Sequence, residues 1–513
     1  MENYILQYYQ KINDGSITAG KWIKLLYQWV LDGIKNKEFY YDQKKAHKAI
    51  AFIEKFCRHH EGELGGQLIK LELWQKAFLS LVFGIVDVEK NRQFREILLV
   101  MGRKNGKALS LDTEIATPNG FVKMQDIHVG DLVFGQDGKA SKVLAESEIF
   151  HKPMYAVTFE DGEVVKASED HIWTIQTKRI RRKDAGYGKP LMTYYGHPIK
   201  ADRTVDITTK EMVNDFVYVR ADGKGVEYKY RVPMNLPVEY SKKELPLDPY
   251  TLGVWLGDGT RGAVEITCAD GDIKEMISHL TEAGHKCRTK KSNEHCKAIT
   301  LDSKDNPGGN GPYSNKTRNA LKELGIFKDK FIPEIYMHSS IEQRMELLQG
   351  LMDTDGYCSK KGQCEFAQKS EKLVDQFREL AASLGIKTSK RLKKIMCNGK
   401  ECEAYSILFF VSKNNPCFKL KRKKVRLKDE LCDRMKFKSI VSIERIADEP
   451  SKCIAIDNES HLYLVGRNYT ATHNTLLASA IATYCAYADG EYGARIYMAA
   501  PKLQQANICY DQC

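Results

Sequence analysis

The sequence predicts a multidomain chain: a split P-loop α/β segment encloses an all-β domain and an α+β domain with an internal repeat. Three observations indicate this fold class. The chain has 513 residues, more than one hydrophobic core usually holds. Turn-rich segments with alternating polarity flank a mixed α/β stretch. A phosphate-binding loop is complete only when residues 108–474 are removed.

The interrupted loop is formed by the residues on either side of this insert. Removing residues 108–474 places Gly106 and Lys107 directly before Thr475, between a strand-like and a helix-like run. A P-loop needs this order, because Lys binds the β/γ-phosphates, Thr binds Mg²⁺ and the helix N-terminus faces the anion. In the continuous chain Ala108 follows Lys107, so the Mg²⁺ ligand is missing. The sequence therefore predicts a precursor with a self-excising insert.

The insert contains two kinds of sequence. Strand-and-turn patterns, such as the alternating run 154–159, predict one all-β domain made of an N-terminal and a C-terminal piece. Between them, residues 252–259 return as residues 349–356, and each copy is followed by a strand and by a helix that ends at Gly. Such a repeat predicts two units related by a pseudo-twofold axis. The expected segments are 1–107, 108–234, 235–428, 429–474 and 475–513.

The repeat carries small residues four positions apart and an acidic residue at each helix end. Gly253 and Gly257 in one copy, with Gly350 and Thr354 in the other, would let two helices approach closely. Asp258 and Asp355 would then lie at adjacent helix ends, where two carboxylates can share divalent cations.

These copies resemble the LAGLIDADG homing endonucleases. The resemblance implies an active, monomeric endonuclease with an internal pseudo-twofold axis that cuts double-stranded DNA at a homing site. It assigns catalysis and Mg²⁺ binding to Asp258 and Asp355. Lys330, in the run Lys330–Pro333, resembles the family's lysine motif between the repeats and would polarise water or stabilise charge.

Basic residues are clustered inside the insert. The net charge of the chain is +12. Several runs of one sign favour a polyanionic partner such as DNA over a merely solvated face. The runs are Lys178–Lys183, Arg288–Lys291, Lys390–Lys394 and Lys419–Lys428.

The flanking pieces resemble the horseshoe-shaped Hint fold of inteins. The matching motifs are Leu109–Thr117, Ser168–His171, Cys453–Tyr463 and Thr470–Asn474. Most inteins begin with Cys or Ser, but this insert begins with Ala108, which has no nucleophile. Either a first Cys was replaced by Ala, which traps a class 1 intein, or another nucleophile acts.

Three residues favour the second account. Trp173, Cys453 and Thr475 form a set that resembles the class 3 inteins, which start without a nucleophile. The resemblance implies that Cys453 attacks the Lys107 carbonyl and that Thr475 then takes the acyl group. It also implies that the Asn474 side chain cuts the chain before Thr475.

The same resemblance assigns supporting roles. Ser168 and His171 would orient the scissile peptide and protonate its leaving nitrogen. His473 and His461 would transfer protons at the other end of the insert. No cofactor is needed for splicing, because proximity within one fold replaces a bimolecular encounter.

The segments outside the insert resemble a phage terminase large subunit. Gln75, in Leu73-Trp74-Gln75, would contact adenine, and Gly106, Lys107 and Thr475 would form the phosphate site. The complete spliced host would use ATP and Mg²⁺, and we expect the given chain to be a truncated precursor. Its N-terminus lacks the layout of a signal peptide, so we expect a cytoplasmic protein without membrane contact.

One further reading of the insert stays open, and another is disfavoured. The insert could be a decayed DNA-binding module in a P-loop ATPase other than a terminase. A plain ATPase with a tolerated insertion is disfavoured, because the insertion separates Lys107 from its Thr.

Overall fold

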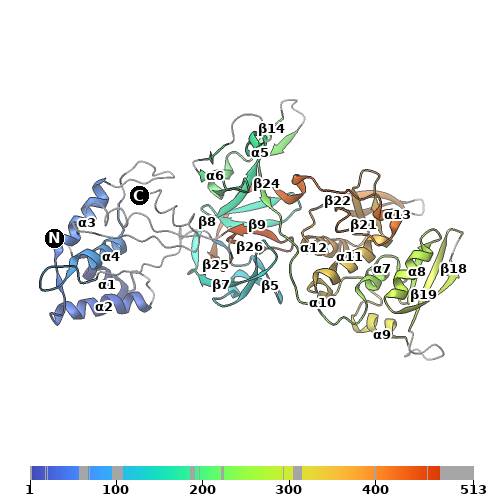
Figure 1. Cartoon of the computed structure of the whole chain (residues 1–513), viewed down its shortest axis with the longest axis horizontal. Coiled ribbons are helices and arrows are strands. Elements are labelled where there is room, and N and C mark those ends of the chain that lie inside the picture. Colours follow the sequence, from blue (N-terminus) through green and yellow to red (C-terminus); the bar gives the residue numbers. More distant parts are fainter. Residues whose placement is uncertain are drawn as a thin grey trace. The chain divides into compact units, whose positions relative to one another are not determined.

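The computed structural model divides into two compact units, one with the described residues up to Phe94 and one with those from Ala108 to His473 (Figure 1). None of the helices in the described ranges has the length and hydrophobicity needed to span a lipid bilayer. The structure describes residues 3–17, 19, 21–56, 68, 70–94, 108–184, 191–195, 197–220, 225–292, 294–303, 315–397, 400–458 and 460–473.

The first unit is helical, with one short hairpin. Helix α1 begins after Asn3, whose side chain accepts the Leu6 amide. Apolar side chains from α1, α2 and α4 form its main core, which includes Ile5, Val30 and Leu81. The elements are α1 (Tyr4–Asn13), α2 (Lys21–Lys35), β1 (Tyr40–Tyr41), α3 (Gln43–Phe56), α4 (Leu73–Gly84) and β2 (Ile85–Val86). The predicted P-loop residues lie outside the described residues.

The two ends of the insert form one strand-rich domain, as expected. A seven-stranded sheet runs in the order β13-β10-β16-β24-β3-β9-β8. Strand β24, from the C-terminal piece, pairs with β16, β3 and β8 of the N-terminal piece. The strands of this sheet are β3 (Leu109–Ser110), β8 (Phe150–Phe159), β9 (Val164–Ser168), β10 (Ile172–Thr177), β13 (Val205–Thr208), β16 (Tyr230–Pro233) and β24 (Phe437–Lys452).

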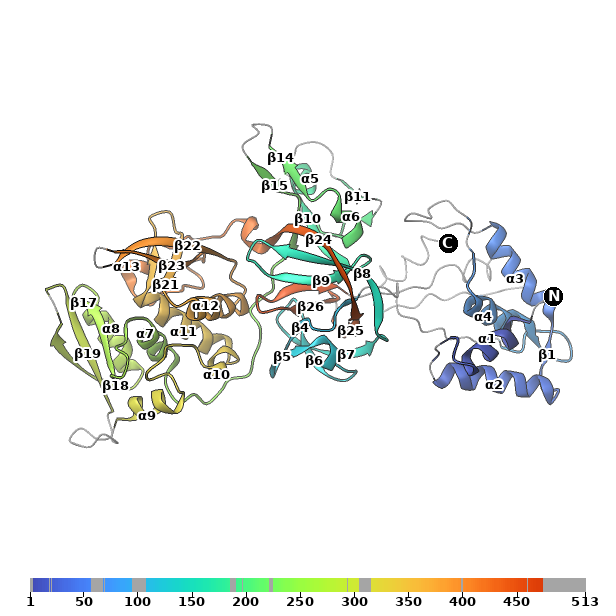
Figure 2. The same cartoon turned by 180° about the vertical axis from the view of Figure 1, so that it is seen from behind.

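Two smaller sheets complete this domain, and each of them also joins both pieces. In the order β27-β26-β4-β5, two C-terminal strands pair with two N-terminal strands, and a third sheet runs β25-β7-β6. Figure 2 shows β4, β5, β26 and β25 gathered in this domain. The strands are β4 (Glu114–Thr117), β5 (Gly120–Lys123), β6 (Leu132–Phe134), β7 (Ala140–Glu146), β25 (Ile454–Ile456), β26 (Leu462–Val465) and β27 (Thr470–His473).

The region predicted to be strands also contains two short helices. Helix α6 (Thr209–Val213) forms because Thr208 and Glu211 make a reciprocal capping box at its start. Helix α5 (Lys178–Asp184) follows β10. Two hairpins lie in the same part of the chain, namely β11 (Thr193–Tyr194) with β12 (His197–Pro198), and β14 (Val217–Val219) with β15 (Val226–Tyr228).

The middle of the insert shows the predicted repeat as two similar halves. The first half has a sheet in the order β17-β19-β18 and the second a sheet in the order β20-β21-β23-β22. The first half contains α7 (Pro249–Asp258), β17 (Glu265–Ala269), α8 (Ile273–Glu282), β18 (His285–Lys291), β19 (Cys296–Ser303) and α9 (Lys316–Glu323). After α10 (Glu334–Met337), the second contains α11 (Ile341–Thr354), β20 (Gly356–Cys358), β21 (Cys364–Gln368), α12 (Glu371–Ser383), β22 (Thr388–Cys397), β23 (Lys400–Phe409) and α13 (Lys421–Lys424).

Helices α7 and α11 pack against each other through their small residues, as predicted (Figures 1 and 2). A Cβ on Gly253 would lie 2.3 Å from the Leu347 carbonyl oxygen and 2.9 Å from Cα of Gly350. A Cβ on Gly257 would meet the Thr354 side chain. The two backbones therefore touch, and this contact sets the position of both helix ends.

Replacing Gly253 with Ala should force α7 and α11 apart, because the atoms it meets are backbone atoms that cannot rotate away. We expect a loss of about 1–3 kcal/mol in the free energy of unfolding of this domain, the range for overpacked cores. Thermal denaturation of the insert measures it. Gly271→Ala is the matched control, because its Cβ would meet nothing within 4 Å. Equal melting temperatures for the two variants would contradict the close helix contact.

Candidate functional site

The turn between β9 and β10 holds the first residue of the insert. Ala108 is fully buried, and its amide nitrogen donates to Oγ of Ser168 at 3.1 Å. The Ser168 amide donates in return to the Ala108 carbonyl oxygen at 2.9 Å. The Ser168 hydroxyl donates to Oδ1 of Asp170 at 2.6 Å, so its oxygen is oriented to accept the Ala108 amide. Sequence reasoning named Ser168 for this place but gave Asp170 no role.

Cys453 follows β24 at the point where this strand pairs with β3. In that ladder Ser451 lies opposite Ser110, and Lys452 lies opposite Leu109. The ladder ends at this second pair, so Cys453 and Ala108 are the residues directly beyond it on the two chain segments. The half-buried Cys453 is further fixed by its amide, which donates to Oγ of Ser147 at 3.0 Å.

His171 connects the start of the insert with its last strand. Its Nε2 is hydrogen-bonded with Oγ1 of Thr472 on β27. The ring lies edge-on to Trp173, with 5.0 Å between ring centroids. The buried Trp173 donates its indole N–H to Oγ1 of Thr209 at 3.0 Å, and Thr209 in turn donates to the His171 carbonyl. The Trp side chain therefore orients His171 from the core.

His473, the last residue of β27, lies beside a carboxylate that sequence reasoning did not single out. Its Nε2 is 3.4 Å from Oδ2 of Asp206 on β13. Burial alone would raise the pKa of Asp206, but the hydrogen bond to His473, with the charges of His473 and Lys200, holds it well below its usual range. The ring of His461 lies 6.2 Å from that of His473. His461, His473 and His171 thus gather near the end of β27.

Several predicted site residues lie outside the described residues. These are Gly106 and Lys107 before the insert, and Asn474 and Thr475 at its end. Within the insert, the described residues begin at Ala108 and end at His473, one residue before Asn474.

Gln75 lies at the start of α4, where the chain turns into the helix. Its Oε1 accepts the Glu72 amide at 2.8 Å and completes a capping box. This hydrogen bond explains its position in the first turn of α4, and its contact with adenine remains a prediction.

Asp258, Asp355 and Lys330 meet at the ends of α7 and α11. Asp258 is the last residue of α7, and Asp355 follows α11 directly. Burial, and then the charge of Asp258, raise the pKa of Asp355 to about 6. Burial also raises the pKa of Asp258, against the charges of Lys330 and Lys423. Lys330 donates to the Gly257 carbonyl at 2.7 Å, and burial lowers its pKa.

This pair of carboxylates fits a divalent cation that is also bound by a substrate. Carboxylate oxygens are the protein ligands that Mg²⁺ prefers, and Mg²⁺ usually takes only one or two of them beside water and phosphate oxygens. Among the described residues, no group of three or more His, Cys, Asp or Glu side chains could hold a metal ion. A cation at Asp258 and Asp355 would therefore need oxygens from outside this set.

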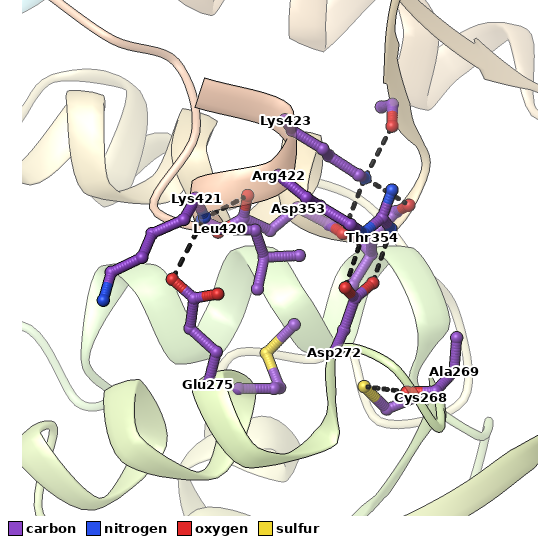
Figure 3. Close-up of polar contacts among 12 residues, drawn as sticks. Cys268, Ala269, Asp272, Glu275, Asp353, Thr354, Leu420, Lys421, Arg422 and Lys423 are labelled. Carbon is purple, nitrogen blue, oxygen red and sulfur yellow. Dashed lines mark hydrogen bonds and ion pairs between the residues drawn. The ribbon is translucent and has the colours of Figure 1, made fainter. Parts of the chain in front are cut away.

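Part of the basic run Lys419–Lys428 has its binding partners inside the domain (Figure 3). For this part of the run, the expectation of contact with a polyanionic partner is corrected. The buried Lys423 ammonium donates to the Met352, Asp353 and Gly356 carbonyls at the end of α11. Arg422 forms a bidentate ion pair with Asp272. Helix ends attract cations, because their last carbonyls lack intrahelical donors. We name residues 421–424, the helix α13, the basic clamp.

Because Asp258 and Asp355 share one site, the charge of Asp258 should affect the pKa of Asp355. Asp258→Asn should lower the pKa of Asp355 below about 6, because it removes a like charge. Lys330→Met should raise the same pKa, because it removes an opposite charge. Carboxyl-carbon NMR titration measures both, with the exposed Lys360→Met as the control. An unchanged Asp355 pKa in the Asp258→Asn variant would show that the two groups do not interact.

Comparison with known proteins finds similarity to helicases, inteins and homing endonucleases. A replicative DNA helicase DnaB from Mycobacterium intracellulare is 30% identical over 383 residues, which cover 72% of this chain and 59% of the helicase. The chain thus spans 59% of that relative's length. The crystal structure of the MchDnaB-1 intein (N145AA) is 13% identical, with a TM-score of 0.23, over 72% of this chain and all of that chain.

Two further similarities are to a homing endonuclease structure and to a domain family. A structure of mesophilic variants from the homing endonuclease I-DmoI is 15% identical, with a TM-score of 0.23, and covers 32% of this chain and 89% of that chain. The family described as LAGLIDADG-like domain matches residues 342–416, which include α11 and Asp355. The chain therefore contains a LAGLIDADG-like domain in the second half of its internal repeat.

Proposed function

We propose that residues 108–474 are an intein that excises itself and joins Lys107 to Thr475. The observation that carries this proposal is the arrangement around Ala108. Its amide nitrogen is held by Ser168, and Cys453 and Ala108 are the residues directly beyond the last pair of the β3–β24 ladder. A thiol next to the first peptide bond of the insert supplies the nucleophile that Ala108 lacks. The splicing motifs at both ends of the insert support the same reading.

The first step is attack by the Cys453 thiolate on the Lys107 carbonyl carbon. A thioester forms, the Lys107–Ala108 C–N bond breaks, and the Ala108 nitrogen leaves as an amine after gaining a proton. Ser168 holds this nitrogen through its N–H. His171, oriented by Trp173, supplies the proton transfer that the leaving amine needs.

The later steps occur at the other end of the insert. The Thr475 hydroxyl takes the acyl group from Cys453, so an ester replaces the thioester. The Asn474 side-chain nitrogen then attacks its own backbone carbonyl, forms a succinimide and releases the Thr475 amine. That amine takes the acyl group from oxygen, which leaves a Lys107–Thr475 peptide bond. His473 and His461 transfer the protons, and no cofactor takes part.

The proposed second activity is site-specific cleavage of double-stranded DNA by the domain at 235–428. Asp258 and Asp355 would hold Mg²⁺, which would activate water and stabilise charge on the scissile phosphate. Lys330 is placed beside both carboxylates, where an ammonium stabilises developing negative charge. The internal repeat supports a monomer, because one chain supplies both halves of the site.

For the host, we propose a P-loop ATPase of the phage terminase type, which would bind ATP and Mg²⁺ once spliced. The sequence around Gln75 and the restored Gly106-Lys107-Thr475 support this assignment. A helicase of the DnaB type is the competing host protein. Alignment of residues 1–107 with terminases and with DnaB helicases would decide between the two assignments.

Splicing depends on Cys453 in this scheme. Expressed full-length chain should yield a free insert and a ligated host fragment, whereas Cys453→Ala should abolish cleavage after Lys107, because it removes the proposed nucleophile. Intact-mass analysis over time measures both products. Cys432→Ala, at an exposed free thiol, is the control and should splice normally.

Two results would contradict this scheme. Continued cleavage after Lys107 in the Cys453→Ala variant would exclude direct attack by Cys453. Splicing that appears only after Ala108→Cys would instead identify a trapped class 1 intein.

DNA cleavage depends on the paired carboxylates. Asp355→Asn should reduce cutting of DNA that carries the joined P-loop codons to background, because the cation loses a charged ligand, while splicing continues. Gel analysis of cleaved DNA measures the first effect and intact mass the second. Asp429→Asn, at an 86% exposed side chain, is the control. DNA left uncut by the unmodified insert would favour a decayed DNA-binding module.

A further inference from the structure

Asp206 is the carboxylate in contact with the residue before Asn474. The His473 side chain is 10% exposed, and its Nε2 lies 3.4 Å from Oδ2 of Asp206. A carboxylate on one ring nitrogen fixes the tautomer and the orientation of an imidazole, and it stabilises the imidazolium. The mechanism above needs His473 to deliver a proton, but it gives no reason for the orientation of the ring.

Asp206 is itself held in place by contacts to its other oxygen. Oδ1 accepts from Oγ1 of Thr174 at 2.6 Å and forms an ion pair with Lys200 at 2.8 Å. Thr174 lies directly opposite Asp206 in the β10–β13 ladder. The two oxygens therefore have separate tasks: Oδ1 fixes the carboxylate, and Oδ2 faces His473.

We propose that Asp206 is a positioning residue for succinimide formation, because it binds Nε2 of His473 and thereby fixes the ring that passes a proton to the Thr475 amine. This inference rests on the proposed splicing function. In that step a C–N bond forms between the Asn474 side-chain nitrogen and its own carbonyl carbon, and the Asn474–Thr475 bond breaks. The Asn474 nitrogen gives up one proton and the Thr475 nitrogen gains one.

The other charged or titratable groups near His473 do not replace Asp206. His461 is a second imidazole, with its ring 6.2 Å away, and a like charge there would destabilise the imidazolium. Lys200 is cationic and contacts Oδ1, the oxygen that does not face His473. His171 is occupied with Thr472, the residue before His473. Asp206 is the carboxylate that the described residues place against this ring.

Cleavage before Thr475 can be measured alone in the full-length Cys453→Ala chain, where the first step is blocked. Adding Asp206→Asn should slow this cleavage by at least about tenfold near neutral pH, the usual cost of losing such a carboxylate–histidine contact. The substitution should also shift the part of the pH–rate profile that reflects His473 deprotonation to lower pH. The reason is that the imidazolium loses its counterion, so His473 deprotonates at lower pH. Intact mass between pH 5 and pH 9 gives the rates.

Two further variants separate orientation from folding. Asp206→Glu keeps the charge and should restore part of the rate and the original pH limb. Asp215→Asn removes another carboxylate of the same domain, one that is 50% exposed and paired with Lys229, and should behave as the parent.

An Asp206→Asn chain with the parent's rate and pH profile would overturn the inference. So would an equal loss of branched-thioester formation when Asp206→Asn is placed in the chain with Cys453 intact, because that loss indicates damage to the fold. A parent chain that never cleaves before Thr475 would instead refute the splicing function itself.

Discussion

The short turn from Ser168 to His171 is the constraint on which the whole strand-rich domain depends. One end of this turn binds the Ala108 amide, and the other binds Thr472 on the last strand. Ala108 and the last strand of the insert, β27, are thereby bound to the same turn. In two sheets of this domain, β24 and β26 pair with strands from the N-terminal piece. Such proximity converts a bimolecular encounter into a reaction within one fold.

The repeated domain in the middle of the insert depends on a different constraint, the contact of two helix backbones at glycine. Because α7 and α11 touch at Gly253 and Gly350, their C-terminal ends bring Asp258 and Asp355 together. The same closeness raises the pKa of both groups through burial and, for Asp355, through like charge. The burial that accompanies this close approach thus makes both carboxylates easier to protonate.

Local patterns allowed much of this architecture to be predicted, and long-range contacts account for the rest. The repeat and the small residues of the helix pair follow from short motifs, and the structure places them as expected, whereas the role of Ser168 stays a prediction. Asp206 could not be found that way, because it is a single carboxylate whose partner His473 lies far along the chain. Helix α6 was missed because its capping box sits within a strand-like pattern. The prediction for the Lys419–Lys428 run was partly wrong, because the local charge of a sequence does not reveal that a lysine will bind backbone carbonyls within the domain.

The basic clamp has a consequence for the ionic-strength dependence of any complex with a nucleic acid. Arg422 already has a protein counterion in Asp272, and Lys423 donates to helix-end carbonyls. Side chains used in this way neutralise no phosphate and displace no condensed cations from the duplex. The slope of log affinity against log salt should therefore be shallower than a count of all basic residues in these runs would give.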